Sequence, residues 1–179
     1  MTEPEKTEPE RTEQLREVWL RGPIDGIPGQ LQPVAHALEQ AREELRGLLP
    51  ELSMELLRTR PGGVASAGFH LRHMAGVLNR LCSYARGEML SEEQFRFLAE
   101  EKNGPAGSEA SPAELVSAFE WQVDQTIAQL RATDDQTLDE LRYVGRQRIP
   151  STVRGLLFHA AEHTQRHLGQ LLVTVRVQR

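Results

Sequence analysis

The sequence predicts an all-α protein that folds as a four-helix bundle with long end connections. Apolar residues recur at intervals of three and four in four long segments, which is the spacing of an amphipathic helix. Residues that favour helix starts precede these segments, and no segment alternates well enough to predict a strand. Aromatic residues make up only 5% of the chain and hydrophobic residues 39%, so the core must be mainly aliphatic, as in many helical bundles.

The 179 residues fall within the usual range for one domain. Residues 1–14 are charged and interrupted by proline, so we expect a frayed or disordered N-terminal tail. Residues 15–179 are expected to form a single helical bundle domain.

The first bundle helix is predicted to begin at Pro33 and to end at Pro50, with a further turn at 53–57. Ser66 is predicted to cap the second helix, which ends before Gly87. The apolar stripes consist of Val34, Leu38, Ala41 and Leu45 in the first helix, and Phe69, His73, Val77, Leu81 and Tyr84 in the second. His73 therefore lies within an apolar stripe.

A long connection joins the second and third bundle helices. It contains a short helical candidate at 91–99, with the spacing of a capping box, and a loop at 103–108. Ser111 carries the cap signature of the third helix, which is predicted to end near Ala132.

Residues 133–149 are mostly polar and are predicted to form a long, partly extended crossover. Either Ser151 or Thr152 caps the fourth helix. Its inner stripe consists of Leu156, Ala160, His163, His167 and Leu171. Two histidines are thus predicted to face inward.

Charge and composition exclude several functions. The formal net charge of −5 gives no electrostatic reason for binding to nucleic acid or to an anionic membrane, and no stretch of 18 apolar residues is present. The N-terminus lacks the apolar region of a secretion signal. The single cysteine, Cys82, lies in an apolar run and is predicted to be a buried structural thiol. We therefore expect a cytoplasmic protein.

Three of the six histidines, His159, His163 and His167, recur at intervals of four in the fourth helical segment. Imidazoles one helical turn apart share a face, and two of them can bind one metal ion. A third ligand must come from another element, and His73 lies on the inward stripe of the second helix. The alternative is that these are hydrogen-bonded core histidines, because an HxxxH spacing also occurs by chance.

Three segments together resemble the DinB superfamily. They are Phe69-His-Leu-Arg-His73-Met-Ala-Gly, Tyr84-Ala-Arg-Gly-Glu88 and Phe158-His-Ala-Ala-Glu-His163-Thr-Gln-Arg-His167-Leu-Gly-Gln170. The resemblance spans about residues 30–177 and implies a DinB-like four-helix bundle. Members bind a divalent metal through one histidine of the second helix and an HxxxH pair of the last, which implies His73, His163 and His167 as the ligands here.

The same resemblance implies one divalent metal (zinc, nickel or iron) and a low-molecular-weight thiol such as bacillithiol as a further cofactor. Related members are similar to bacillithiol- or mycothiol-dependent S-transferases, and members are commonly homodimers. We expect a metal-dependent transferase that conjugates such a thiol to an electrophilic small-molecule substrate. A metal-dependent hydrolase and a non-catalytic metal-binding protein of the stress response are the alternatives.

Other polar residues near the motifs are assigned lesser roles. His159 and His70 are candidates for contacts beside the ligands, with His159 one turn deeper, and a purely structural role is the alternative for both. Glu162 is expected to point away, so no acidic residue is predicted beside the pair. Six arginines could bind an anionic thiol, but the sequence favours a solvated surface role for each. They are Arg80, Arg86, Arg146, Arg148, Arg166 and Arg176.

Overall fold

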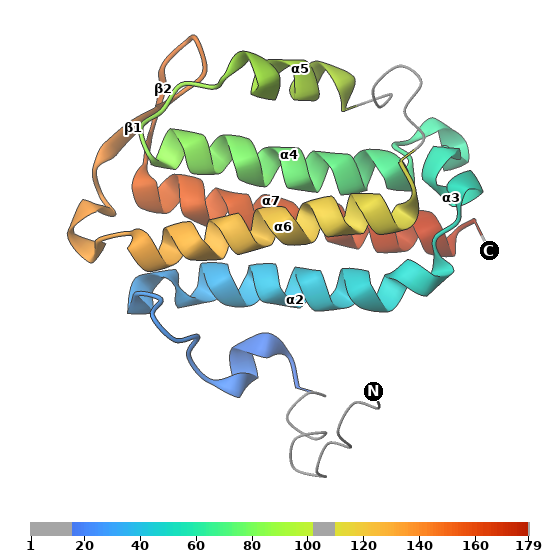
Figure 1. Ribbon diagram of the computed structural model, residues 1–179, viewed down its shortest axis with the longest axis horizontal. Coiled ribbons are helices and arrows are strands. Elements are labelled where there is room, and N and C mark those ends of the chain that lie inside the picture. The colour runs from blue at the N-terminus through green and yellow to red at the C-terminus, as the bar shows by residue number, and fades with distance from the viewer. Residues whose placement is uncertain (1–15, 102–109, 179) are drawn as a thin grey trace.

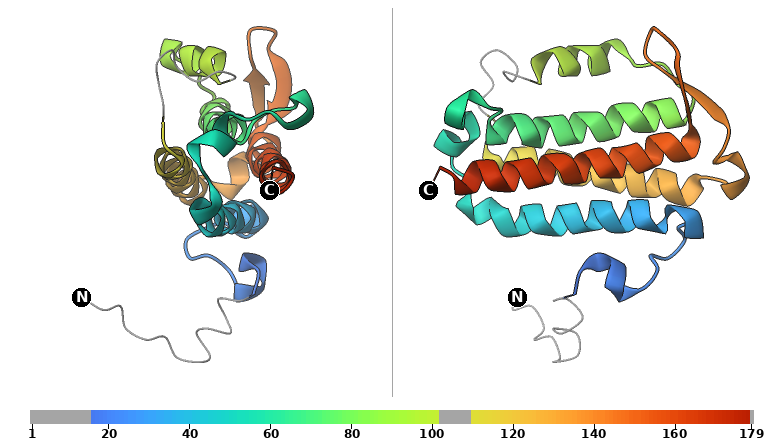
Figure 2. Two further views of the ribbon diagram at one scale, coloured as in Figure 1. Left: turned by 90° about the vertical axis from the view of Figure 1, so that its right-hand side faces the viewer. Right: turned by 180° about the vertical axis from the view of Figure 1, so that it is seen from behind.

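The bundle helices lie side by side in the computed structural model, which describes residues 16–101 and 110–178 (Figure 1). They are α2 (Gln32–Leu48), α4 (Ala67–Ala85), α6 (Pro112–Ala132) and α7 (Val153–Arg176). α4 and α6 run in one direction, whereas α2 and α7 run in the other (Figures 1 and 2). The predicted mostly helical, four-helix bundle fold is confirmed. The predicted tail and the loop at 103–108 lie outside the described residues.

Side-chain caps fix where the α-helices other than α2 begin, whereas α2 starts without one. Each cap accepts a hydrogen bond from the backbone N–H three residues later, which satisfies a group that has no partner inside the helix. The caps are Ser53, Ser66, Ser91, Ser111 and Thr152. Ser111 and Glu114 form a reciprocal capping box, as do Ser91 and Gln94. Of the two residues that the sequence left open for the fourth helix, Thr152 is the cap.

Short elements connect the bundle at its two ends. The predicted turn after the first helix is present as α3. The short elements are the 3₁₀ helices η1 (Val18–Arg21), η2 (Gly29–Leu31), η3 (Leu49–Glu51), η4 (Pro61–Gly63) and η5 (Asp135–Thr137), and the helix α3 (Met54–Arg58). η1 lies against α2 on the outside of the bundle (Figure 1).

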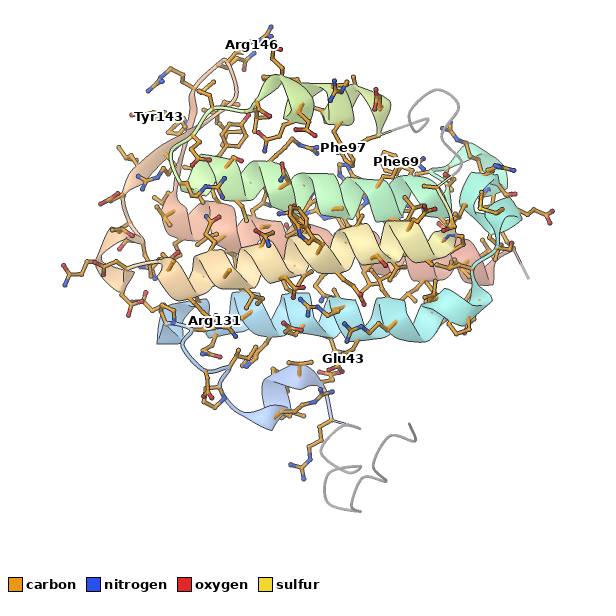
Figure 3. The ribbon with its side chains drawn as sticks, viewed as in Figure 1. Glu43, Phe69, Phe97, Arg131, Tyr143 and Arg146 are labelled. Carbon is orange, nitrogen blue, oxygen red and sulfur yellow. The ribbon has the colours of Figure 1, made fainter. Side chains whose placement is uncertain are left out.

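Helix α5 (Glu92–Glu100) lies over α4, outside the layer of the bundle helices (Figures 1 and 2). None of its residues is fully buried. It is held by Gln94, whose Nε2 donates to Ser83 Oγ of α4 at 2.8 Å, and by Phe97, which Figure 3 shows between the two helices. The C-terminal end of α5 lies beside His73 of α4, because Glu101, the residue that follows α5, contacts the His73 ring.

The crossover contains an antiparallel hairpin of β1 (Leu141–Val144) and β2 (Ile149–Thr152), with Leu141 opposite Thr152. The prediction of no strand was wrong here. The strands have only four residues each, and their apolar residues Leu141, Tyr143 and Ile149 are exposed. The outward apolar side chains disturb the alternation that identifies a half-buried strand. Gly145, with φ of 66°, adopts the left-handed conformation needed at the turn.

The core lies between the bundle helices and is largely aliphatic, as predicted. Phe119 is the one aromatic residue among its largest fully buried side chains in the described part of the chain. The buried face of α4 differs from the predicted apolar stripe. Leu71, Met74 and Leu78, which lie outside that stripe, are fully buried, whereas Phe69, which belongs to it, is only partly buried. Neighbours on several sides bury most of α4, so no single apolar stripe marks its inner face. Cys82 is buried, which confirms that prediction.

Among residues 16–101 and 110–178, no helix combines the length and the hydropathy that a membrane span would need.

Candidate metal centre

The two helices that carry the histidines pack against each other in opposite directions (Figures 1 and 2). His73 lies in the N-terminal half of α4, and His163 and His167 lie one turn apart on α7. All three are partly buried at the seam between the helices, beside the fully buried face of α7 that includes Thr164 and Leu168. The structure thus brings together the three residues that the sequence analysis assigned as ligands.

The three imidazoles converge closely. One nitrogen from each of His73, His163 and His167 lies within 4.8 Å of the other two. Nε2 of His73 is 2.9 Å from Nε2 of His163. The ring of His167 completes the cluster. Its centroid lies 4.4 Å from the ring centroid of His73 and 4.6 Å from that of His163.

Two members of the cluster are held in the neutral form. Burial, and to a lesser extent the nearby His73, lower the pKa of His163 to about 4. Burial and the same neighbour lower the pKa of His167 to about 4 as well. Both rings are therefore neutral near pH 7, the form in which imidazole donates a lone pair to a metal.

These residues fit a divalent ion such as zinc, nickel or iron. Two imidazoles bound at about 2.1 Å to one ion can be at most about 4.2 Å apart, and the 2.9 Å between His73 and His163 satisfies this limit. Nδ1 of His163 is buried and has no hydrogen-bond partner among the described residues, so the cluster is not a closed hydrogen-bonded core network. An all-imidazole donor set suits each of these three metals.

Glu101, which directly follows α5, is a site residue that the sequence analysis missed. Its side chain is only 4% exposed. Oε2 lies 2.7 Å from Nδ1 of His73, and Oε1 forms an ion pair with Arg80. Burial alone would raise the pKa of Glu101, but the hydrogen bonds from His73 and Arg80 outweigh this and hold the pKa below its usual value. Glu101 is therefore an anion in contact with the cluster.

Two sequence-based assignments are corrected by this contact. The expectation that no acidic residue lies beside the pair of α7 did not extend to Glu101, which contacts His73 of α4, and Glu162 brings a carboxylate oxygen within 4.8 Å of a nitrogen of His163 rather than pointing away. Arg80 is buried rather than solvated. Glu101 follows another glutamate in a polar segment, so no sequence pattern distinguishes it. A weak signal was available on α4. Gly76 and Arg80 follow His73 at three and seven residues, on the same helix face.

Gly76 leaves space where α4 approaches Glu101. A Cβ atom built there would lie 2.3 Å from Oε1 of Glu101 and 2.7 Å from both Arg80 and Phe97, closer than real atoms approach. The glycine inside the helix therefore makes room for the carboxylate.

The two additional histidines differ in their placement. His70 is 4% exposed, and its Nδ1 lies 3.0 Å from Nδ1 of His167, so it contacts the cluster. Burial, and to a lesser extent the nearby imidazole of His73, lower the pKa of His70 to about 4. His159, which the sequence placed one turn deeper, has 49% of its side chain exposed, and its Nδ1 contacts Glu162 Oε2 at 3.0 Å. Glu162 also pairs with Arg166.

Phe69, labelled in Figure 3, covers one side of the cluster, with its ring stacked on that of His73 at 5.1 Å. His159, Glu162 and His163 also bring donor atoms within 4.8 Å of one another, at the more exposed side of the cluster.

The predicted surface role holds for five of the six arginines. Arg146 lies over the ring of Phe95, and Arg148 lies over that of Tyr143. Arg86, Arg146, Arg148, Arg166 and Arg176 are all exposed.

Comparison with known proteins supports the fold and the family. The family model described as "DinB superfamily" matches residues 37–171. A solved structure, a conserved protein from Enterococcus faecalis, is similar with a TM-score of 0.62 at 20% identity, covering 82% of this chain and 95% of that chain. No curated protein matches. The family match spans most of the chain and includes all three clustered histidines, and we conclude that this chain belongs to the DinB superfamily.

Proposed function

We propose that this protein is a divalent-metal-dependent transferase that conjugates a low-molecular-weight thiol to an electrophilic small molecule. The observation that carries the proposal is the convergence of His73, His163 and His167 as a set of three donors, with no fourth among the described residues. Three protein ligands leave positions open for an exchangeable molecule, as in catalytic rather than structural sites. The cation held there would be zinc, nickel or iron.

A divalent ion with open positions lowers the pKa of a thiol or water that binds it, and so supplies a thiolate or hydroxide nucleophile at neutral pH. The chain's own residues strengthen this effect. All three ligands would be imidazoles, and a neutral imidazole, unlike a carboxylate or thiolate, does not cancel positive charge. Partial burial of the rings also keeps part of the surrounding water away, so electrostatic effects at the site are less screened.

The nearby carboxylates favour a thiol reaction over hydrolysis. Both oxygens of Glu101 are already in contact with His73 and Arg80, and Glu162 pairs with Arg166. Glu101 is therefore not free to act as a general base on a water molecule, and Glu162 belongs to a surface ion pair. A thiol needs less help, because its own pKa is already much closer to neutrality than that of water.

The thiol must come from outside the protein. Cys82 is buried and lies 3.5 Å from Thr126 Oγ1, and burial raises the pKa of its thiol. A buried, protonated thiol is a poor nucleophile. An external thiol such as bacillithiol is therefore the proposed co-substrate, which agrees with the S-transferases that the sequence resembles.

The proposal is tested with the Co²⁺-loaded protein. Addition of bacillithiol, mycothiol or glutathione should produce a sulfur-to-cobalt charge-transfer absorption with at least one of them. The same thiol should be conjugated to a chromogenic electrophile such as 1-chloro-2,4-dinitrobenzene, with loss of chloride. Both signals should disappear in His163→Ala and persist in His159→Ala, which removes an exposed histidine of the same helix. Metal-loaded protein that shows neither signal with any of the three thiols would contradict the proposal.

A second candidate is a non-catalytic metal-binding protein, in which the ion only ties two helices together. It is favoured by the origin of the ligands, since His73 belongs to α4 and the other two to α7. In that case metal should raise thermal stability, and no thiol should give the cobalt absorption or turnover.

A further inference from the structure

We propose that Glu101 is a positioning residue for the metal centre, and that its carboxylate holds His73 in the tautomer whose Nε2 is free to bind the ion. This inference rests on the proposed metal site and adds a residue to it from outside the three-histidine motif.

The contacts of the His73 ring determine which of its nitrogens carries the proton. Its Nδ1 lies 2.7 Å from Oε2 of Glu101, while its Nε2 faces His163. An ionised carboxylate only accepts hydrogen bonds, so Nδ1 must carry the proton and donate it. In the neutral ring Nε2 then keeps its lone pair, directed at the cluster. Carboxylates that contact metal-binding histidines in this way fix the ring and raise its basicity.

Residues of α4 hold Glu101 in place. Arg80 pairs with its other oxygen, and the Nε of Arg72 donates to its backbone oxygen at 3.3 Å. The absence of a side chain at Gly76 leaves the space that the carboxylate occupies. Arg80 has donors only, so it anchors Oε1 and leaves Oε2 for His73. α4 thus carries the ligand, the space and the anchor on one face.

The contact with Glu101 is specific to His73 among the three clustered histidines. Nδ1 of His163 has no partner among the described residues, and Nδ1 of His167 faces His70, another imidazole. Within the described chain, His73 is the cluster member in contact with a carboxylate. Changing Glu101 should therefore alter His73 and leave the other two rings in place.

The variant Glu101→Gln gives a specific expectation. The glutamine has a single oxygen, and Arg80 can only donate, so that oxygen should turn to Arg80. The amide NH₂ would then face Nδ1 of His73 and donate to it. His73 would be forced into the tautomer with the proton on Nε2, which blocks the lone pair that binds the ion.

The experiment combines two measurements on wild type, Glu101→Gln, Gly76→Ala and Glu93→Gln. Glu93 is an exposed residue of α5, so its variant is the matched control for loss of one negative charge. In the metal-free proteins, ¹⁵N NMR of the imidazole nitrogens should show the Nδ1–H tautomer of His73 in wild type and Glu93→Gln. It should show the Nε2–H tautomer in Glu101→Gln.

Zn²⁺ affinity, measured by competition with a chelator, should be about 10–100-fold weaker in Glu101→Gln and unchanged in Glu93→Gln. Gly76→Ala should also weaken Zn²⁺ binding, because it displaces the carboxylate without altering any charge. If Glu101→Gln does not fold, Gly76→Ala and its His73 tautomer decide the question. Melting temperatures separate these effects from a general loss of stability.

The outcomes distinguish this inference from the proposed function. Folded Glu101→Gln that binds Zn²⁺ as wild type does, or that keeps the Nδ1–H tautomer, would overturn the role of Glu101. Wild type that binds no metal at all would overturn the metal site, and the tautomer in the metal-free protein would still show whether Glu101 orients His73.

Discussion

At the scale of single residues, the three clustered histidines differ in what their second ring nitrogen contacts. His73 faces the Glu101 carboxylate, His167 faces His70, and the Nδ1 of His163 has no partner in the described part of the chain. Because a carboxylate fixes the tautomer and an imidazole does not, His73 has the most strictly oriented ring. The metal centre would therefore form around a fixed ligand on α4 and a pair on α7.

The lowered pKa values predict that acid destabilises the metal-free protein. His70, His163 and His167 take up protons near pH 4 when folded but near 6.5 when unfolded. Between these values the unfolded chain binds more protons, so the free energy of unfolding falls as pH falls. The contribution is complete above about pH 6.5 and is lost towards pH 4.

Urea unfolding of the metal-free protein at pH 7.5, 6.0 and 5.0 measures this effect. The midpoint should decrease steadily, and it should decrease less in His163→Gln, which removes one of these groups. A midpoint at pH 5.0 equal to or above that at pH 7.5 would show that the buried histidines are not held neutral.

The sequence was sufficient to predict which three histidines come together but not their surroundings. The HxxxH spacing and the apolar neighbours of His73 are local features, and each concerns residues of a single helix. The contact of Glu101 with His73 joins residues 28 positions apart, across α5 and α4. Such a contact depends on how α5 packs, which no local pattern encodes. The exposure of His159 was likewise decided by packing.

At the scale of elements, two glycines in helices have opposite surroundings. A Cβ at Gly68, in the first turn of α4, would lie 2.7 Å from the backbone oxygen of Leu57 in α3. At Gly169 of α7 nothing lies within 4 Å of the added atom. Alanine favours a helix by roughly 0.8–1.0 kcal/mol over glycine where space allows.

Gly169→Ala is therefore expected to raise the melting temperature by about 2–4 °C for a chain of this size. Gly68→Ala should lower the stability by about 1–3 kcal/mol, because α3 must move away from α4. Thermal unfolding of both variants, with the metal state held constant, tests the close approach of the two helices. A Gly68→Ala protein as stable as Gly169→Ala would contradict it.

The helices were predictable because local signals mark them, a side-chain cap at the start of α4, α6 and α7 and apolar spacing along α2. Ser66, Ser111 and Thr152 all cap the helices expected of them. The hairpin could not be predicted from the sequence, since its two strands pair only with each other and leave Leu141 and Ile149 exposed. Burial of one face is what gives a strand its alternating pattern, and this hairpin buries too little to produce it.

At the scale of the whole molecule, a bound ion would join α4 to α7 through side chains that are far apart in the sequence. A ligand that binds only the folded state stabilises it, by about 2.7 kcal/mol at a free concentration 100 times the dissociation constant. Zn²⁺ should therefore raise the melting temperature of wild type, with no comparable rise in His73→Ala. An equal rise in both proteins would mean that the ion binds elsewhere. The homodimer that the family resemblance implies stays a prediction.

The most direct test of the central claim is the metal content per chain, measured by elemental analysis on untagged protein purified without added metal. Wild type should contain one divalent ion per chain. The ion should be lost in His73→Ala and in His163→Ala, which remove a ligand from each helix, and retained in His159→Ala. Wild type that carries no ion, and takes up none on titration near neutral pH, would reduce the three histidines to partly buried polar residues.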